Sequence, residues 1–96
     1  MAALDPHQVQ KRVSQLSGWQ VVNGELVKTF SFKDFTAALG FVNRVGEAAE
    51  TAGHHPDIDI RYNRVRLALV THDAGGLTQK DFDLAAQADS LSSSAE

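Results

Sequence analysis

Three histidines are the residues of this sequence best suited to chemistry. His54 and His55 are adjacent and precede Pro56, and His72 closes a strand-like run later in the chain. An imidazole has an unperturbed pKa of about 6.5, so it gives or takes a proton near neutral pH. If the fold brings the three rings together, they can act as general acid and general base. The fourth histidine, His7, lies far away in the sequence and is expected on the solvated surface.

Two carboxylates lie where they can serve these rings. Glu50 is about one helical turn before the histidine pair, and Asp81 opens the last predicted helix. Either can orient an imidazole or hold a ligand amide, because a carboxylate accepts from two donors at once. Asp81 could instead have a purely structural role. It occupies the third helical position of a capping box that begins at Thr78, where a carboxylate stabilises the start of the helix.

Other site chemistries fit the sequence less well. Histidines bind zinc by converging tetrahedrally, and an adjacent pair is awkward for that geometry, so we expect no metal. A nucleophile is not evident, because there is no cysteine and Ser31 lies in no recognisable motif. Histidines that merely lie on a surface loop are the remaining alternative. The position of His72, at the matching end of the paired strand, weakens that alternative.

Length and composition favour one small domain spanning residues 1–96. The chain has no cysteine, which excludes disulfides and thiolate metal sites. No apolar run is long enough for a signal peptide or a membrane span, so we expect a cytoplasmic protein without a membrane partner. The formal charge of −3 argues against a nucleic-acid partner. One basic group, expected to be a solvated hairpin tip, comprises Arg61, Arg64 and Arg66.

The first part of the chain is predicted to be a helix followed by a hairpin. Asp5-Pro6 predicts the helix start, because aspartate caps helices and proline fits the first helical position. Asn23-Gly24 predicts a tight turn, since both residues accept positive φ. The turn joins strands at 19–22 and 26–32. Trp19 is expected either in the core or as an aromatic wall for a flat ligand.

A long central helix and a second hairpin follow. The helix is predicted from Asp34 to Gly53, because aspartate suits its start and glycine suits a left-handed C-terminal residue. Its apolar residues recur at helical spacing and are Phe35, Leu39, Val42 and Ala49. Alternating residues then predict strands at 57–62 and 65–71, with the isoleucines on the buried face and the charges on the solvated one.

The last helix begins at the predicted capping box at Thr78, and residues 91–96 are expected to form a frayed tail. The resulting order is α-β-β-α-β-β-α. Two hairpins with helices packed on one face form an α+β two-layer sandwich with a four-stranded antiparallel sheet.

The register of the second hairpin decides what the histidines meet. If Asn63-Arg64 are the two loop residues, His55 lies opposite His72. The same register places His54 opposite Asp73. Directly opposed residues are about 4.5 to 5.5 Å apart, which is close enough to share a small ligand. We therefore expect one site at this end of the hairpin.

These residues form a spaced pattern that resembles the signature of the pterin-4a-carbinolamine dehydratases. The pattern is Glu50, three residues, His54-His55-Pro56, five residues, Tyr62, nine residues, His72, eight residues and Asp81. Further similar segments are Gly18-Trp19, Phe32-Lys33-Asp34-Phe35, Gly40-Phe41, Arg44-Val45, Thr71-His72 and Gly76-Leu77. The resemblance spans about residues 16–90. Five parts with every gap matched are far more specific than one short motif.

The resemblance implies an enzyme that removes water from 4a-hydroxytetrahydropterin to give quinonoid dihydropterin. This step recycles the tetrahydrobiopterin-type cofactor of aromatic amino acid hydroxylases. In this family the histidines matching His54, His55 and His72 line the pterin site, and neither a metal nor another cofactor is used. We expect His54 and His72 to form the acid–base pair and His55 mainly to bind. The substrate-binding positions implied by the resemblance are Glu50, Pro56, Thr71, Asp73, Asp81 and Trp19.

The resemblance also leaves alternatives open. Some family members are dimerisation cofactors of a homeodomain transcription factor, and a relative could act on another pterin, such as in molybdopterin metabolism. A homodimer or homotetramer is the expected state. Two positions depart from the family pattern: Gly53 stands where members often carry Asn or Asp, and Lys80 where relatives can have Arg. Neither departure removes a catalytic group.

Overall fold

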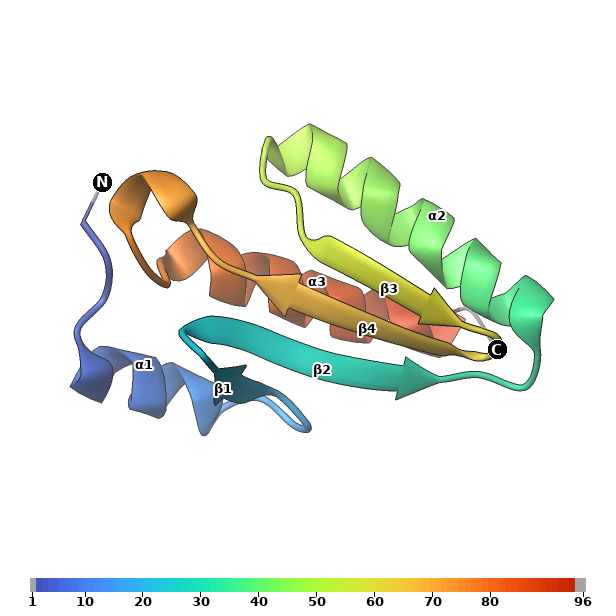
Figure 1. Cartoon of the computed structure of the whole chain (residues 1–96), viewed down its shortest axis with the longest axis horizontal. Coiled ribbons are helices and arrows are strands. Elements are labelled where there is room, and N and C mark those ends of the chain that lie inside the picture. The colour runs from blue at the N-terminus through green and yellow to red at the C-terminus, as the bar shows by residue number, and fades with distance from the viewer. Residues whose placement is uncertain (1, 95–96) are drawn as a thin grey trace.

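The computed structural model describes residues 2–94, which form one antiparallel sheet and its helices (Figure 1). The strand order is β1-β2-β4-β3, so β1 and β3 are the edges. In chain order the elements are α1 (Pro6–Val13), β1 (Gln20–Val22), β2 (Glu25–Ser31), α2 (Phe35–Ala52), β3 (Asp57–Arg61), β4 (Arg64–Leu69), the 3₁₀ turn η1 (His72–Ala74) and α3 (Gln79–Ser94). The predicted α+β fold and its element order are confirmed.

The core lies between the sheet and the two long helices. Phe41 and Val45 of α2 and Ala85 of α3 belong to the same buried cluster as Val65 and Leu67 of β4. Burying a large apolar side chain stabilises a fold by about 1.5–3 kcal/mol. This packing holds both ends of the site in place, because the histidine pair follows α2 and Asp81 lies in the first turn of α3.

Local caps determine where the helices begin and end. Asp5 forms a full capping box with Gln8 at the start of α1, and Asp34 caps α2. Gly53 ends α2 in the left-handed region with φ 63°, a conformation that costs a residue with a Cβ about 1–2 kcal/mol. The chain therefore turns sharply just before His54.

The two hairpins differ in how well the sequence predicts them. Asn23 and Gly24 take φ values of 51° and 80°, as a tight turn of this kind requires. In the second hairpin Arg61 pairs with Arg64, so the loop residues are Tyr62 and Asn63. The predicted Asn63-Arg64 loop is wrong, and the pairing is shifted by two residues.

Contacts with the end of β2 explain the shift. Asn63 Nδ2 donates to the Phe32 carbonyl at 2.7 Å, and Phe32 N donates to the Asn63 carbonyl at 2.8 Å. These bonds fix Asn63 in the loop, and Tyr62 takes a left-handed φ of 50°. Tertiary hydrogen bonds therefore select the loop residues, overriding the preferences of the turn sequence.

The shift changes how the histidines are held. The β3–β4 ladder ends at Asp57, two residues after His55. The predicted opposition of His55 to His72, and of His54 to Asp73, is therefore wrong. The two segments leave the sheet before they reach the histidines, and η1 carries His72.

The central helix is confirmed, but it presents a different side to the core. Its buried residues are Ala38, Phe41, Val45 and Ala49. Phe35 and Leu39, which belong to the predicted stripe, are 46% and 42% exposed. Because α2 is apolar on more than one side, spacing alone could not identify the side that the sheet covers.

The edge strand and the last helix also depart from the prediction. Ile58 is 38% exposed, because β3 is an edge strand and its apolar face is only partly covered. Tyr62 is 68% exposed because it lies in the hairpin loop and not on the strand face where it was predicted. Helix α3 continues through Ser94, so residues 91–94 are helical, and the fraying expected for residues 91–96 stays a prediction. Residues 95–96 lie outside the described range.

Within residues 2–94, no helix combines the length and apolar character needed to cross a membrane.

Candidate active site

His54 is held at the turn that follows α2. Its backbone N–H donates to the Ala49 carbonyl at 3.1 Å, and the left-handed Gly53 donates to both Ala49 and Glu50 carbonyls. These bonds satisfy the last carbonyls of the helix and fix the direction in which the chain leaves it. The His54 side chain is only 10% exposed, and its Nε2 lies 2.6 Å from Asp81 Oδ1.

Asp81 is a fully buried carboxylate with partners for both oxygens. Oδ1 faces His54, while Oδ2 accepts from the Thr71 hydroxyl and from Thr78 N, each at 2.9 Å. A buried charge is tolerated when it is paired and hydrogen-bonded in this way. The bond from Thr78 N is the helix-capping contact that the sequence suggested. Asp81 therefore caps α3 and orients an imidazole at the same time.

His55 has a different environment. Its Nε2 contacts Glu50 Oε2, but the two side chains are 62% and 76% exposed. Glu50 lies in the last turn of α2 and also lines a hollow of about 860 Å³ between α2 and Ile58 of β3. Solvent screens a pair of this kind, so the contact leaves the His55 ring free to turn toward a ligand.

His72 lies in a second turn next to the same carboxylate. It directly follows Thr71, whose hydroxyl donates to Asp81, and its side chain is exposed. A bridge between Thr71 and Gly76 closes the turn, with Thr71 N donating to the Gly76 carbonyl at 3.1 Å. Asp73 is exposed in the same turn. Two separate turns, one after α2 and one after β4, thus meet at Asp81.

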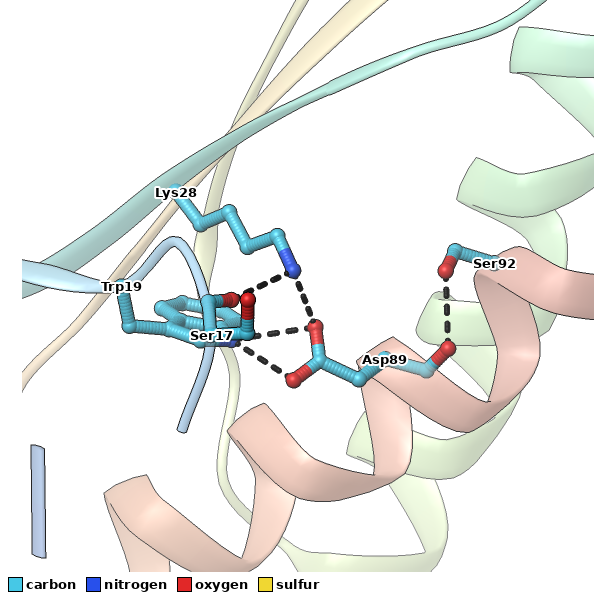
Figure 2. A network of polar contacts seen from close by, with 5 residues as sticks. All are labelled: Ser17, Trp19, Lys28, Asp89 and Ser92. Atoms are coloured by element: carbon cyan, nitrogen blue, oxygen red, sulfur yellow. Dashed lines mark hydrogen bonds and ion pairs between the residues drawn. The ribbon is translucent and has the colours of Figure 1, made fainter. Parts of the chain in front are cut away.

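Trp19 takes part in a separate network, shown in Figure 2. Its indole is 4% exposed and donates to both oxygens of Asp89, at 3.1 and 3.0 Å. Lys28 Nζ donates to Asp89 at 2.7 Å and to the Ser17 carbonyl at 2.9 Å. Trp19 also lines an apolar hollow of about 640 Å³ between α1, β1 and Gly75-Gly76. These contacts place it in the core, and its contact with substrate remains a prediction.

The structure connects most of the predicted site, although not by the predicted register. His54, Asp81 and Thr71 are directly bonded, His55 and Glu50 form a neighbouring pair, and Pro56 is the part-buried residue before β3. Within residues 2–94, no cluster of three or more histidine and carboxylate side chains is arranged to hold a metal ion.

Sequence reasoning missed one residue of this network, Thr78. Its hydroxyl is 2.8 Å from the Thr71 hydroxyl, and the residue is 2% exposed. The available signal was its place three residues before Asp81, which we assigned to helix capping alone.

Sequence comparison identifies the family. Residues 2–91 match the family described as pterin 4 alpha carbinolamine dehydratase. The chain belongs to this family. A protein of Acidobacterium capsulatum, provisionally named pterin-4-alpha-carbinolamine dehydratase, is 60% identical over 91 residues, which cover 95% of this chain and 99% of the relative. A protein of Chloroflexus aurantiacus with the same provisional name is 55% identical over 91 residues, covering 95% and 98%.

Solved structures agree with the family fold. A protein described as a transcriptional coactivator/pterin dehydratase from Brucella melitensis superposes with a TM-score of 0.91 at 33% identity, covering 94% of this chain and 98% of that one. A pterin dehydratase-like protein, described as a RuBisCO assembly factor in the alpha-carboxysome, gives a TM-score of 0.64 at 24% identity, covering 77% and 86%. The second likeness concerns the fold alone. The predicted resemblance to pterin-4a-carbinolamine dehydratases is confirmed.

Proposed function

We propose that this protein dehydrates 4a-hydroxytetrahydropterin to quinonoid dihydropterin, with His54 and His72 as the acid–base pair. In this role it recycles, in the cytoplasm, the tetrahydrobiopterin-type cofactor of aromatic amino acid hydroxylases. Membership of a pterin dehydratase family supports the reaction class. The observation that carries the proposal is the 2.6 Å contact of His54 Nε2 with the buried Asp81, because a ring held by a fixed carboxylate is oriented for proton transfer.

The reaction needs two proton transfers and no change of oxidation state. The N5 lone pair forms a double bond to C4a while the C4a–O bond breaks with its electrons on oxygen. An imidazolium protonates the departing hydroxyl to give water, and a neutral imidazole takes the N5 proton. Two histidines in different protonation states can perform both steps near neutral pH. Proton exchange with water then restores the starting states.

The other site residues are assigned to binding. His55 is the exposed ring next to the pair, and Glu50 limits its orientation. Pro56 and Asp73 flank the two turns that carry the histidines and are proposed to contact the pterin.

An assay of 4a-hydroxytetrahydropterin dehydration tests the proposal. Replacing a general acid or base costs about 10²–10⁴-fold in rate, so His54→Ala and His72→Ala are each expected to lose that much. His7→Ala, in the exposed first turn of α1, is the matched control and should retain full activity. A wild type no faster than the uncatalysed reaction would overturn the enzyme proposal. Full activity in both active-site variants would overturn only the assignment of residues.

Exhaustive chelation tests the metal-free mechanism separately. We expect the rate to remain unchanged, since imidazoles alone supply the two proton transfers. A loss of activity that added metal restores would contradict this part of the proposal.

We also propose that α2 mediates contact between copies of this chain in a homodimer or homotetramer. Phe35 and Leu39 lie one helical turn apart and are 46% and 42% exposed. Neighbouring apolar side chains on one side of a helix mark an interaction surface when they remain exposed. If this protein acted as a dimerisation cofactor, the same surface would bind a helix of the partner protein.

Light scattering coupled to size-exclusion chromatography measures this association. Leu39→Glu should lower the molar mass relative to the wild type, because it places a charge within the apolar contact. Thr51→Glu, also exposed on α2 but twelve residues beyond Leu39, is the control and should leave the mass unchanged. A monomeric wild type, or an unchanged mass for Leu39→Glu, would exclude this surface.

A further inference from the structure

The hydroxyls behind Asp81 form a chain with only one consistent direction. Thr71 donates its single hydroxyl proton to Asp81 Oδ2 at 2.9 Å. Thr78 must then donate to Thr71 across their 2.8 Å contact, because Thr71 has no second proton. The order is therefore Thr78 to Thr71 to Asp81. Both threonines are buried.

Helix capping does not require this chain. The Asp81 carboxylate accepts from Thr78 N, and Asp81 N donates to the Thr78 carbonyl at 3.1 Å. In a full capping box the threonine hydroxyl would accept from the third backbone N–H of the helix. Here the Thr78 hydroxyl bonds to Thr71 and is directed toward the carboxylate that holds His54.

The same donors determine the tautomer of His54. Oδ2 of Asp81 already has two donors, and Oδ1 of an ionised carboxylate can only accept. The proton in the 2.6 Å contact therefore belongs to His54 Nε2. A neutral His54 with its proton on Nε2 has its free lone pair on Nδ1.

We propose that Thr78, acting through Thr71 and Asp81, is a positioning residue that fixes His54 in the Nε2–H tautomer. Nδ1 is then the atom that exchanges the proton with the pterin. The neutral ring accepts a proton at Nδ1, and the imidazolium gives that proton back. Throughout, Nε2 keeps its own proton and donates it in a hydrogen bond to Asp81. The identification of a pterin as the proton-exchange partner of Nδ1 rests on the proposed function. The tautomer of His54 and the direction of the hydroxyl chain do not depend on it.

Nitrogen-15 NMR of the labelled full chain tests the tautomer without any assay. At a pH where the ring is neutral, long-range ¹H–¹⁵N correlations should show a protonated Nε2 and a bare Nδ1 for His54. The His54 signals are identified by their loss in His54→Gln. A proton on Nδ1 in the wild type would overturn the proposal, whether or not the protein is an active dehydratase.

Asp81→Asn gives a stringent second measurement. The amide oxygen should accept from Thr71 and Thr78, as Oδ2 does now, so the amide N–H₂ faces His54 Nε2. An N–H donor requires a bare Nε2, so the tautomer should change to Nδ1–H. In a serine protease the corresponding change lowers kcat about 10⁴-fold through the wrong tautomer. A folded Asp81→Asn protein that retains Nε2–H would contradict the assignment.

Kinetics of the threonine variants test the role of Thr78. Thr78→Val should lower kcat about fivefold with little change in KM, because Thr78 acts on His54 and does not touch the pterin. This fold-change corresponds to the loss of one neutral hydrogen bond of about 1 kcal/mol. Thr78→Ser retains the hydroxyl and should restore the rate and the wild-type His54 spectrum. Thr29→Val, exposed on β2, is the control. A Thr78→Val protein with wild-type kcat and an unchanged His54 spectrum would show that the hydroxyl has only a structural role.

Discussion

At the residue scale, the two adjacent histidines have carboxylate partners in opposite environments. His54 and Asp81 are 10% and 0% exposed, whereas His55 and Glu50 are 62% and 76% exposed. Removing one partner of a buried pair leaves an uncompensated group, but water replaces a lost partner at the surface. His54 is therefore held rigidly, while His55 can adjust to a ligand.

This difference predicts unequal effects of neutralising the two carboxylates. Glu50→Gln should raise KM by no more than about fivefold and leave kcat unchanged, since an exposed ion pair contributes about 0–1 kcal/mol. Glu47→Gln, exposed one turn earlier on α2, is the matched control. Steady-state kinetics of dehydration measure both constants. A drop in kcat for Glu50→Gln comparable to that of His54→Ala would show that Glu50 takes part in proton transfer.

At the element scale, local signals predicted the helix ends and tertiary contacts decided the register. Asp5, Asp34 and Gly53 act through bonds to residues three or four positions away, so their sequence neighbourhood contains the information. The second hairpin instead depends on Asn63, which binds Phe32 across 31 positions. No local pattern records that contact, and the predicted loop was displaced for this reason.

The candidate site divides in the same way. Motif spacing indicated that His54, Glu50 and Asp81 belong together, but not which carboxylate serves which ring. That choice depends on α2 and α3 packing beside each other, which brings Asp81 to His54 across 27 positions. Thr78 was hidden because a capping residue and a residue of the hydroxyl chain look identical in sequence.

The end of α2 provides a stability test at this scale. Gly53→Ala should lower the free energy of unfolding by about 1–2 kcal/mol, because φ is 63° and a Cβ disfavours that conformation. Gly53→Asn should lose less, since asparagine tolerates the left-handed region. Gly46→Ala, inside the same helix with open space around its Cβ position, should gain about 1 kcal/mol. Urea unfolding at one fixed protein concentration compares the three, and equal losses in both Gly53 variants would disprove the backbone explanation.

At the scale of the whole molecule, one polar network joins segments that are distant in sequence. Asp89 of α3 accepts from the Trp19 indole before β1 and from Lys28 of β2 (Figure 2). Lys28 Nζ also lies 4.7 Å from the Phe30 ring centre. Asp89 is eight residues after Asp81 on α3, which is about 12 Å along a helix axis. The network therefore fixes one end of α3 against the sheet, while Asp81 and His54 lie near the other end.

Asp89→Ala should consequently reduce stability without changing the chemistry. The buried Trp19 indole N–H would lose its acceptor, and an unsatisfied buried donor costs about 1–3 kcal/mol. Asp83→Ala removes an exposed carboxylate from the same helix, where it accepts from Gln79, and should change stability by no more than about 0.5 kcal/mol. Urea unfolding measures both changes, and the dehydration assay at a temperature where both variants are folded should give wild-type kcat. A large loss of kcat in folded Asp89→Ala would contradict this expectation. It would show that the contacts of Asp89 also determine the position of Asp81 at the start of α3, so that the Asp89 network and the Asp81 network are coupled.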